Sequence, residues 1–150
     1  MSTPSLSMFS EFEKQMALQD VYNVVTSSQL KIRIFGLQQK ITKDKYGSII
    51  ARESEYVEVS AFPIQYSPTA KELEAIGVLD RMDVTAYCSS KELKDLGLIA
   101  DYGYSKKDNL SIIDTTIVDK WNNEYRVATI QNYSAFMDSY LYVVFGLLRR

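Results

Sequence analysis

The feature that most constrains this chain is a succession of strand-like segments at hairpin spacing. Extended segments rich in apolar residues occur at 30–34, 48–66, 78–88, 116–118, 125–130 and 140–148. In the first of them apolar and charged residues alternate, and a period of two is typical of a strand that buries one face. The strands do not alternate regularly with helices, which argues against a parallel sheet. The pattern predicts a mainly β fold, a small antiparallel β-barrel or sandwich with a few short helices.

The N-terminal segment is the one long helical segment that the sequence predicts. Apolar residues recur at roughly helical spacing from Phe12 and Met16 to Val25, and Ser10 with Glu13 fits a capping box at the start. We therefore expect residues 1–28 to form an N-terminal helical arm. Residues 29–150 are then a single β-rich domain, because a chain of 150 residues holds one domain of ordinary size.

Two shorter helices are predicted between strands. The first follows Ser67-Pro68, with Ser67 as the N-cap, and the second follows Ser89; Gly77 and Gly97 end them. We also expect a bulge within the long strand that ends at residue 66. A tight hairpin turn is expected at residues 122–123, where both residues are Asn, because Asn tolerates the left-handed conformation.

The composition excludes most catalytic chemistry. The chain has no histidine and one cysteine, Cys88, which excludes common zinc sites and Ser-His-Asp or Cys-His nucleophiles. It has no glycine-rich phosphate-binding motif. The acidic pairs Asp80 with Asp83 and Asp114 with Asp119 are expected on opposite strand faces, as solvated surface groups. We expect that the protein is not an enzyme and that it has no catalytic, cofactor or metal site. Cys88 is expected to be a packed thiol.

Charge and hydropathy limit the classes of partner that the chain can bind. The formal net charge is −2, so the chain lacks the basic footprint of a protein that holds nucleic acid tightly. Its N-terminus does not resemble a secretory signal. The longest apolar run, Tyr140–Leu148, has about nine residues, and a membrane-spanning helix needs about 20. We therefore expect no membrane partner, and we expect the last strand to be buried in the core or in an interface.

Tyrosines are the residues that suggest a protein interface. The chain has 11 of them, and a tyrosine ring packs while its hydroxyl stays hydrated. A loop at 101–109 keeps aromatic and basic residues together, as contact loops do. The C-terminal arginines are also candidates, while packing of Trp121 and the tyrosines within the barrel and its subunit contacts is the simpler alternative. The candidate interface residues are Tyr102, Tyr104, Lys106, Lys107, Arg149 and Arg150.

The second half of the chain carries a recognisable order of residues. Ile113–Tyr133 reads IDTTIVDKWNNEYRVATIQNY, and the chain ends in YLYVVFGLLRR. The segment resembles the hairpin of the head-closure (head–tail joining) proteins of tailed bacteriophages, in which an Asp and an Ile or Val precede a Y-x-V strand. Asp114, Ile117, Tyr125 and Val127 stand close to those places.

The first half is similar to the same family. A strand at 30–34 leads through a polar turn at 43–47 to a long strand that ends in Phe62-Pro63-Ile64, then Ser67 and a helix with Glu72. The resemblance covers residues 30–150. The chain departs from the family at its hairpin turn, which has two Asn where the family usually has Gly, and residues 89–110 form a longer segment. The N-terminal helix has no counterpart.

The resemblance implies a structural protein of the virion neck, assembled in the cytoplasm of the host bacterium. Identical subunits would form a ring that matches the symmetry of the portal, between the portal–adaptor complex and the tail. Genomic DNA would only pass through its lumen. The resemblance leaves open head closure itself, a neighbouring neck ring and a tail terminator.

A function of another class is a monomeric nucleic-acid-binding module resembling an oligonucleotide-binding fold. Tyr102, Tyr104 and Trp121 would then stack on bases. The negative net charge of the chain argues against this alternative.

Overall fold

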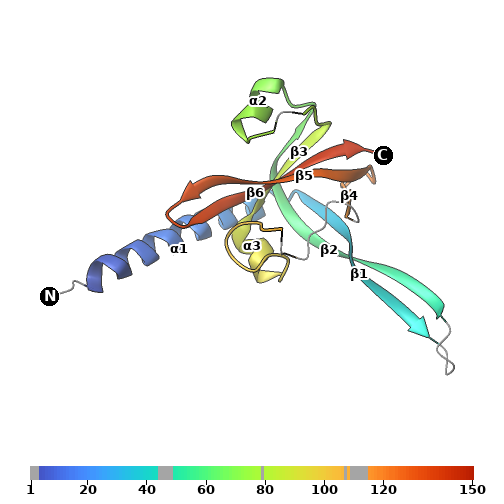
Figure 1. Ribbon diagram of the computed structural model, residues 1–150, viewed down its shortest axis with the longest axis horizontal. Helices are drawn as coiled ribbons and strands as arrows, with labels where there is room; N and C mark the ends of the chain where they lie inside the picture. The colour runs from blue at the N-terminus through green and yellow to red at the C-terminus, as the bar shows by residue number, and fades with distance from the viewer. Residues whose placement is uncertain (1–3, 44–48, 79, 107, 109–114) are drawn as a thin grey trace.

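Six antiparallel strands form a closed barrel in the computed structural model, which describes residues 4–43, 49–78, 80–106, 108 and 115–150 (Figure 1). The strands pair in the order β1-β2-β3-β6-β5-β4, and β4 returns to β1. Of the two predicted architectures, the barrel is therefore confirmed. The elements are α1 (Pro4–Ser27), β1 (Lys31–Lys43), β2 (Ile49–Tyr66), α2 (Ala70–Ala75), β3 (Val84–Ser89), α3 (Ser90–Asp95), β4 (Thr116–Val118), β5 (Glu124–Phe136) and β6 (Ser139–Arg149).

The barrel interior is filled by side chains from all six strands, together with Leu93 of α3. β6 is central because it pairs with β3 on one side and with β5 on the other. Its alternate residues Val143, Phe145 and Leu147 are buried, which confirms that the last strand packs in the core. Cys88 is also fully buried, as predicted, and burial raises the pKa of its thiol well above the usual range.

A second apolar cluster lies on the outer face of the barrel, where side chains of α2 pack with residues of β3 and β6. α2 lies near the end of β3 (Figure 1). Tyr87 and Val144 belong to this cluster, and they alternate with the residues that face the interior. The ring of Tyr87 also packs against the rings of Tyr133 and Tyr142, and the three ring centroids lie 5.6 to 6.2 Å apart. The tyrosine-rich composition is thus partly used on this outer face, since aromatic rings favour such edge-to-face contacts.

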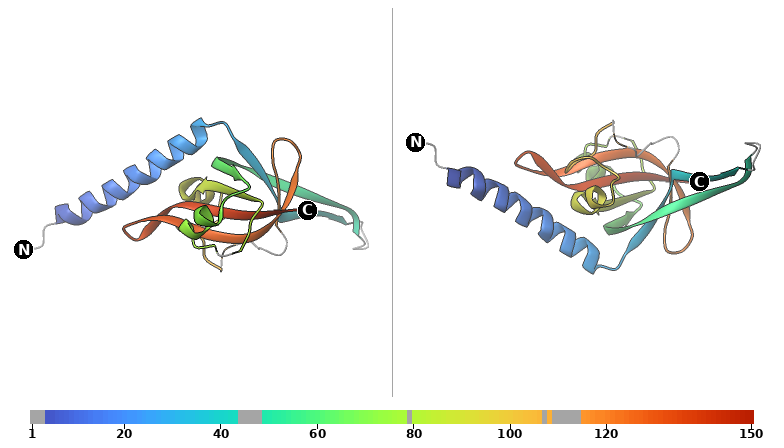
Figure 2. Two further views of the ribbon diagram at one scale, coloured as in Figure 1. Left: turned by 90° about the horizontal axis from the view of Figure 1, so that it is seen from above. Right: turned by 90° about the horizontal axis from the view of Figure 1, so that it is seen from below.

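The N-terminal helix begins earlier than the predicted capping box at Ser10. It begins at Pro4, so Ser10 lies inside it and does not cap it. Proline suits the first helical position because its fixed φ and missing N–H fit there. α1 ends at Ser27, as predicted, and runs along one side of the barrel with its N-terminal end pointing away (Figure 2). Its residues Leu18 and Val25 are fully buried.

Lys14 gives α1 a polar contact with the barrel. Its Nζ lies 3.2 Å from a carboxylate oxygen of Asp138, in the turn between β5 and β6. No helix in the described part of the chain combines the length and apolar content needed to cross a membrane.

Two local predictions are wrong at their boundaries. The strand expected over 78–88 is formed only from Val84, because residues 80–83 lie outside the strand and Met82 packs with side chains of α2. The first short helix is capped by Thr69, not by Ser67. Ser67 takes a positive φ of 54°, whereas Thr69 and Glu72 complete a capping box.

The other local signals are confirmed. Ser89 caps α3, and Gly77 and Gly97 follow the two short helices with positive φ. A bulge interrupts the pairing of β2 with β3 between Ala61 and Ile64. Asn122 has a φ of 63° in the turn between β4 and β5.

The hairpin of β1 and β2 extends well beyond the barrel (Figures 1 and 2). β1 pairs with β4 only at residues 33–35, and β2 pairs with β3 only at 61–66. The outer part of the hairpin, 38–43 paired with 49–55, has no third strand among the described residues. We call this part the ribbon; at about 3.3 Å per residue it is roughly 20 Å long. The polar turn predicted at 43–47 lies almost wholly outside the described residues.

Candidate interaction site

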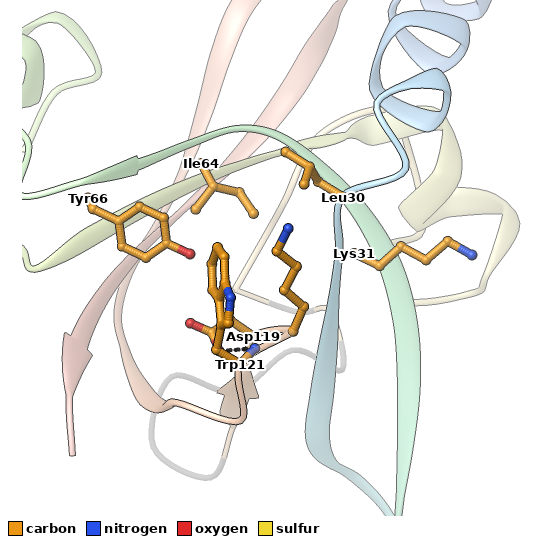
Figure 3. A pocket seen from close by; sticks show the side chains of 7 residues that line it. Leu30, Lys31, Ile64, Tyr66, Asp119 and Trp121 are labelled. Carbon is orange, nitrogen blue, oxygen red and sulfur yellow. Dashed lines mark hydrogen bonds between the residues drawn. The ribbon is translucent and has the colours of Figure 1, made fainter.

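An apolar depression lies where the turn between β4 and β5 meets the end of β2 (Figure 3). Tyr66 and Trp121 form one side, and Ile64 and Leu30 close the other. We call this depression, together with Lys120 at its rim, the turn hollow. Its volume is about 70 Å³, far below the roughly 300 Å³ at which pockets for drug-sized ligands begin. The turn hollow therefore suits a side chain of another protein better than a cofactor.

Asp119 holds the turn that presents Trp121. Its carboxylate accepts hydrogen bonds from the backbone N–H groups of Trp121 and Asn123, each at 2.9 Å. It also accepts from the side-chain amide of Asn123 at 3.2 Å and from the hydroxyl of Tyr125 at 3.0 Å. Asp119 is only 4 % exposed, so the prediction that it is a solvated surface group is wrong. The reason is its position at the start of the turn, where four donors replace water.

Trp121 is the most exposed aromatic side chain of the turn hollow. It is 60 % exposed and meets Tyr66, which is 43 % exposed, edge-on with ring centroids 6.1 Å apart. Packing of Trp121 inside the barrel is thus contradicted. The Nζ atom of Lys120 lies 4.5 Å from the centroid of the Trp121 ring, a cation–π contact. Large exposed aromatic rings with a nearby cation are typical of protein contacts.

A second exposed apolar feature lies on α1. Phe12 and Met16 are 62 % and 50 % exposed, and they stand one helical turn apart on the same face. Leu18 and Val25 are buried on the opposite face, since residues advance about 100° each along a helix. We call Phe12 and Met16 the helix knob.

Helical spacing alone does not reveal the helix knob, because it does not show which apolar residues of the helix face the barrel. The helix has apolar side chains on two opposite faces, and only one of them packs on the barrel. A sequence search could have found this by plotting Met16 and Leu18, two residues apart, on opposite sides of a helical wheel.

The predicted interface residues fall in two separate places. Tyr102 and Tyr104 lie near the hairpin of β5 and β6: the carbonyl of Tyr102 accepts from the N–H of Tyr140, and Tyr104 exchanges backbone hydrogen bonds with the side chain of Asn132. Tyr104 is half-buried against the core, and burial raises the pKa of its hydroxyl. Tyr102 is half-buried beneath Lys94.

The basic candidates are divided in the same way. Lys106 is exposed in the loop, and Lys107 lies outside the described residues. Arg149 and Arg150 are exposed at the other end of the barrel, where the backbone N–H of Arg149 donates to a carboxylate oxygen of Asp83 at 2.9 Å. The structure therefore brings the arginines close to the turn hollow and leaves the loop residues elsewhere; their role in an interface stays a prediction.

Glu92 is a half-buried acidic group whose ionisation opposes folding. Burial raises the pKa of its carboxyl, an effect opposed by the backbone N–H of Ser60, which donates to Oε1 at 3.0 Å, and by Lys31. Its other oxygen is buried and has no hydrogen-bond partner in the described part of the chain. The folded-state pKa exceeds the unfolded value of about 4.3. The free-energy cost of burying the ionised carboxylate is therefore absent below that pH. It develops as the pH rises through the folded pKa.

We predict that Glu92→Gln removes this pH dependence. Glutamine keeps an acceptor for Ser60 and cannot ionise, so the variant gains stability relative to the wild type between pH 4 and pH 7. Urea unfolding at both pH values measures the difference, with Glu74→Gln as an exposed control. If the stability difference between the variant and the wild type were the same at pH 4 and at pH 7, the assignment would be contradicted.

Comparison with protein-family models gives no match, and a search of curated proteins gives none either. The function is therefore argued from the residues and the geometry described above.

Proposed function

We propose that the chain is a structural subunit of a phage neck, in which copies form a ring between the portal–adaptor complex and the tail. The observation that carries the proposal is that one barrel sends two projections in opposite directions, α1 and the ribbon (Figures 1 and 2). A ring subunit needs two different surfaces, because each copy contacts one neighbour on either side. Head closure, a neighbouring neck ring and a tail terminator all have this requirement.

The ribbon supports assembly with partners. Two strands without a third are marginally stable in water, and their outer edges leave backbone N–H and C=O groups unpaired. Such edges accept a strand from another chain. The ribbon is therefore a suitable element to contact another chain of the assembly, while the barrel provides the wall of the ring.

The chemistry of the barrel agrees with a structural role. The buried acid Asp119 is fully used in holding a turn, and the buried thiol of Cys88 is packed in the core. Of the basic groups near the turn hollow, Lys31 lies 3.6 Å from Glu58 and Arg33 donates to Asn122. A net charge of −2 fits a lumen through which DNA passes without being held.

Sedimentation velocity tests the proposal. Alone, the 17.2 kDa chain should sediment as a monomer, because the ribbon gains its partners only in the neck. After mixing with a cognate portal–adaptor complex it should co-sediment with that complex. A variant in which a two-residue turn replaces residues 38–55 should stay monomeric in the mixture. Wild-type chain that remains at the monomer boundary would contradict the neck role.

One observation favours the nucleic-acid-binding alternative. A shallow depression of about 300 Å³ lies next to the turn hollow, close to the exposed ring of Trp121. Three basic residues line it together with two acidic ones: Lys31, Arg33, Lys120, Glu58 and Asp119. A single base could stack on the ring of Trp121. Tyr104 cannot stack in the same way, since it packs against the core. Oligonucleotide binding that weakens steeply with salt and is lost in Trp121→Ala would favour this function over the neck ring.

A further inference from the structure

We infer that the helix knob of one copy inserts into the turn hollow of the next copy, and that this contact joins neighbouring subunits head to tail. The inference rests on the proposed ring and names the surfaces that form it. The occupant of the turn hollow is therefore a second copy of this chain.

The two surfaces are matched in chemistry. The helix knob offers an aromatic ring and a thioether on one helical row, Phe12 and Met16. The turn hollow offers apolar walls from Ile64 and from the faces of Tyr66 and Trp121. A methionine sulfur packs favourably against aromatic rings, and its flexible side chain adapts to a small depression. A hollow of about 70 Å³ accommodates a side chain and not a whole helix.

The charges are complementary. Asp20 continues the row of Phe12 and Met16 by one more helical turn, and Glu13 flanks it; both carboxylates are exposed. Within the part of the chain that the structure describes, neither of them has an ion-pair partner. At the turn hollow Lys120 likewise has no carboxylate within ion-pair distance among the described residues. An acidic helix face therefore meets a basic rim, which orients the two copies and disfavours contact between identical surfaces.

The placement makes the contact heterologous. The N-terminal half of α1 lies at one end of the molecule, and the turn between β4 and β5 lies toward the other end (Figures 1 and 2). The two surfaces of one chain consequently cannot satisfy each other. A contact between different surfaces of identical copies repeats from copy to copy, and it forms a ring when the rotation between copies closes.

The contact is small, which determines when it forms. Two side chains in the turn hollow cover much less than the roughly 800 Å² per partner of a standard stable interface. A single pair of copies should therefore dissociate readily. Copies held next to one another on a portal–adaptor complex meet at high effective concentration, and a closed ring repeats the contact around its circumference.

Cysteine cross-linking tests the contact directly. Met16→Cys and Lys120→Cys place one thiol on the helix knob and one at the turn hollow, while the native Cys88 is fully buried. Equal amounts of the two single variants, treated with a short bis-maleimide, should give a cross-linked dimer that contains one copy of each. A chain that carries both substitutions should give a ladder of trimers and larger products.

The matched control is Met137→Cys, since Met137 is 51 % exposed and Met16 is 50 % exposed. Combined with Lys120→Cys, it should give at least tenfold less product. The reaction is run with concentrated protein alone and again with the cognate portal–adaptor complex present. No Met16-to-Lys120 product under either condition, or equal product with the Met137 control, would overturn the inference.

The outcomes separate the interface from the neck role. If the chain assembles on the portal–adaptor complex but gives no Met16-to-Lys120 product, the interface is wrong and the neck role stands. If the cross-links form in concentrated protein but the chain ignores the portal–adaptor complex, the head-to-tail contact stands and the neck role is wrong.

Discussion

Replacing Asp119 with Ala is expected to lower the free energy of unfolding by about 3 kcal/mol. The substitution removes an acceptor that is hydrogen-bonded by four donors in a site only 4 % exposed. The hydroxyl of Tyr125 is the most costly of the groups left behind, because the tyrosine is 1 % exposed and water cannot easily replace the carboxylate. An unsatisfied buried group of this kind costs about 1–3 kcal/mol by itself.

Guanidinium unfolding followed by circular dichroism measures the loss. Asp119→Asn keeps one acceptor oxygen and should lose less stability than Asp119→Ala. Glu124→Ala removes an exposed carboxylate five residues away and should change stability by no more than about 0.5 kcal/mol. A loss in Asp119→Ala as small as that of Glu124→Ala would show that the carboxylate does not hold the turn.

Replacing Phe145 with Ala is expected to cost about 3–5 kcal/mol, the range for deleting a fully buried aromatic ring. Phe145 is 0 % exposed and lies on β6, between β3 and β5, where the surrounding strands cannot easily collapse into the cavity. A domain of this size has a total stability of only about 5–15 kcal/mol. The variant should therefore be partly unfolded near 37 °C.

Thermal unfolding of Phe145→Ala and of the control Tyr140→Ala measures this effect. Tyr140 stands on the same strand and is 40 % exposed, so its loss should be much smaller. Deleting residues 140–150 removes the strand that links β3 to β5 and should leave an aggregated or unfolded product. A soluble, folded truncation would contradict the central place of β6 in the barrel.

The strands could be predicted because their signals are local. The alternation of apolar and charged residues indicated the start of β1. Asn122 indicated the hairpin turn because Asn tolerates positive φ. The continuous apolar run of β6 also indicated burial. Sequence alone did not decide between barrel and sandwich, since the pairing of β4 with β1 that closes the sheet joins residues far apart in the chain.

The candidate interaction site was the harder part to predict. Asp119 was expected on a strand face as a solvated surface group, yet it is buried because the turn folds four donors around it. The helix knob depends on how α1 docks against the barrel, and nothing local decides which of its two apolar faces is covered. Trp121 shows the same limit, because a single tryptophan is more often buried than presented at a turn.

The ribbon is the part of the fold that the sequence only partly indicated. The long second strand was expected, but the first was expected to end at Ile34 and instead continues to Lys43. Continued pairing with β2 extends it, although no third strand supports this part among the described residues. The same lack of support is the reason to expect that the ribbon is completed by a partner.

Native mass spectrometry of the chain, alone and with a cognate portal–adaptor complex, tests the neck ring most directly. The account predicts a monomer of 17.2 kDa alone. In the mixture it predicts a complex whose added mass equals one full ring of copies, in the symmetry of the portal, with no partial rings as the main species. A portal–adaptor complex that gains no mass would contradict the proposed function.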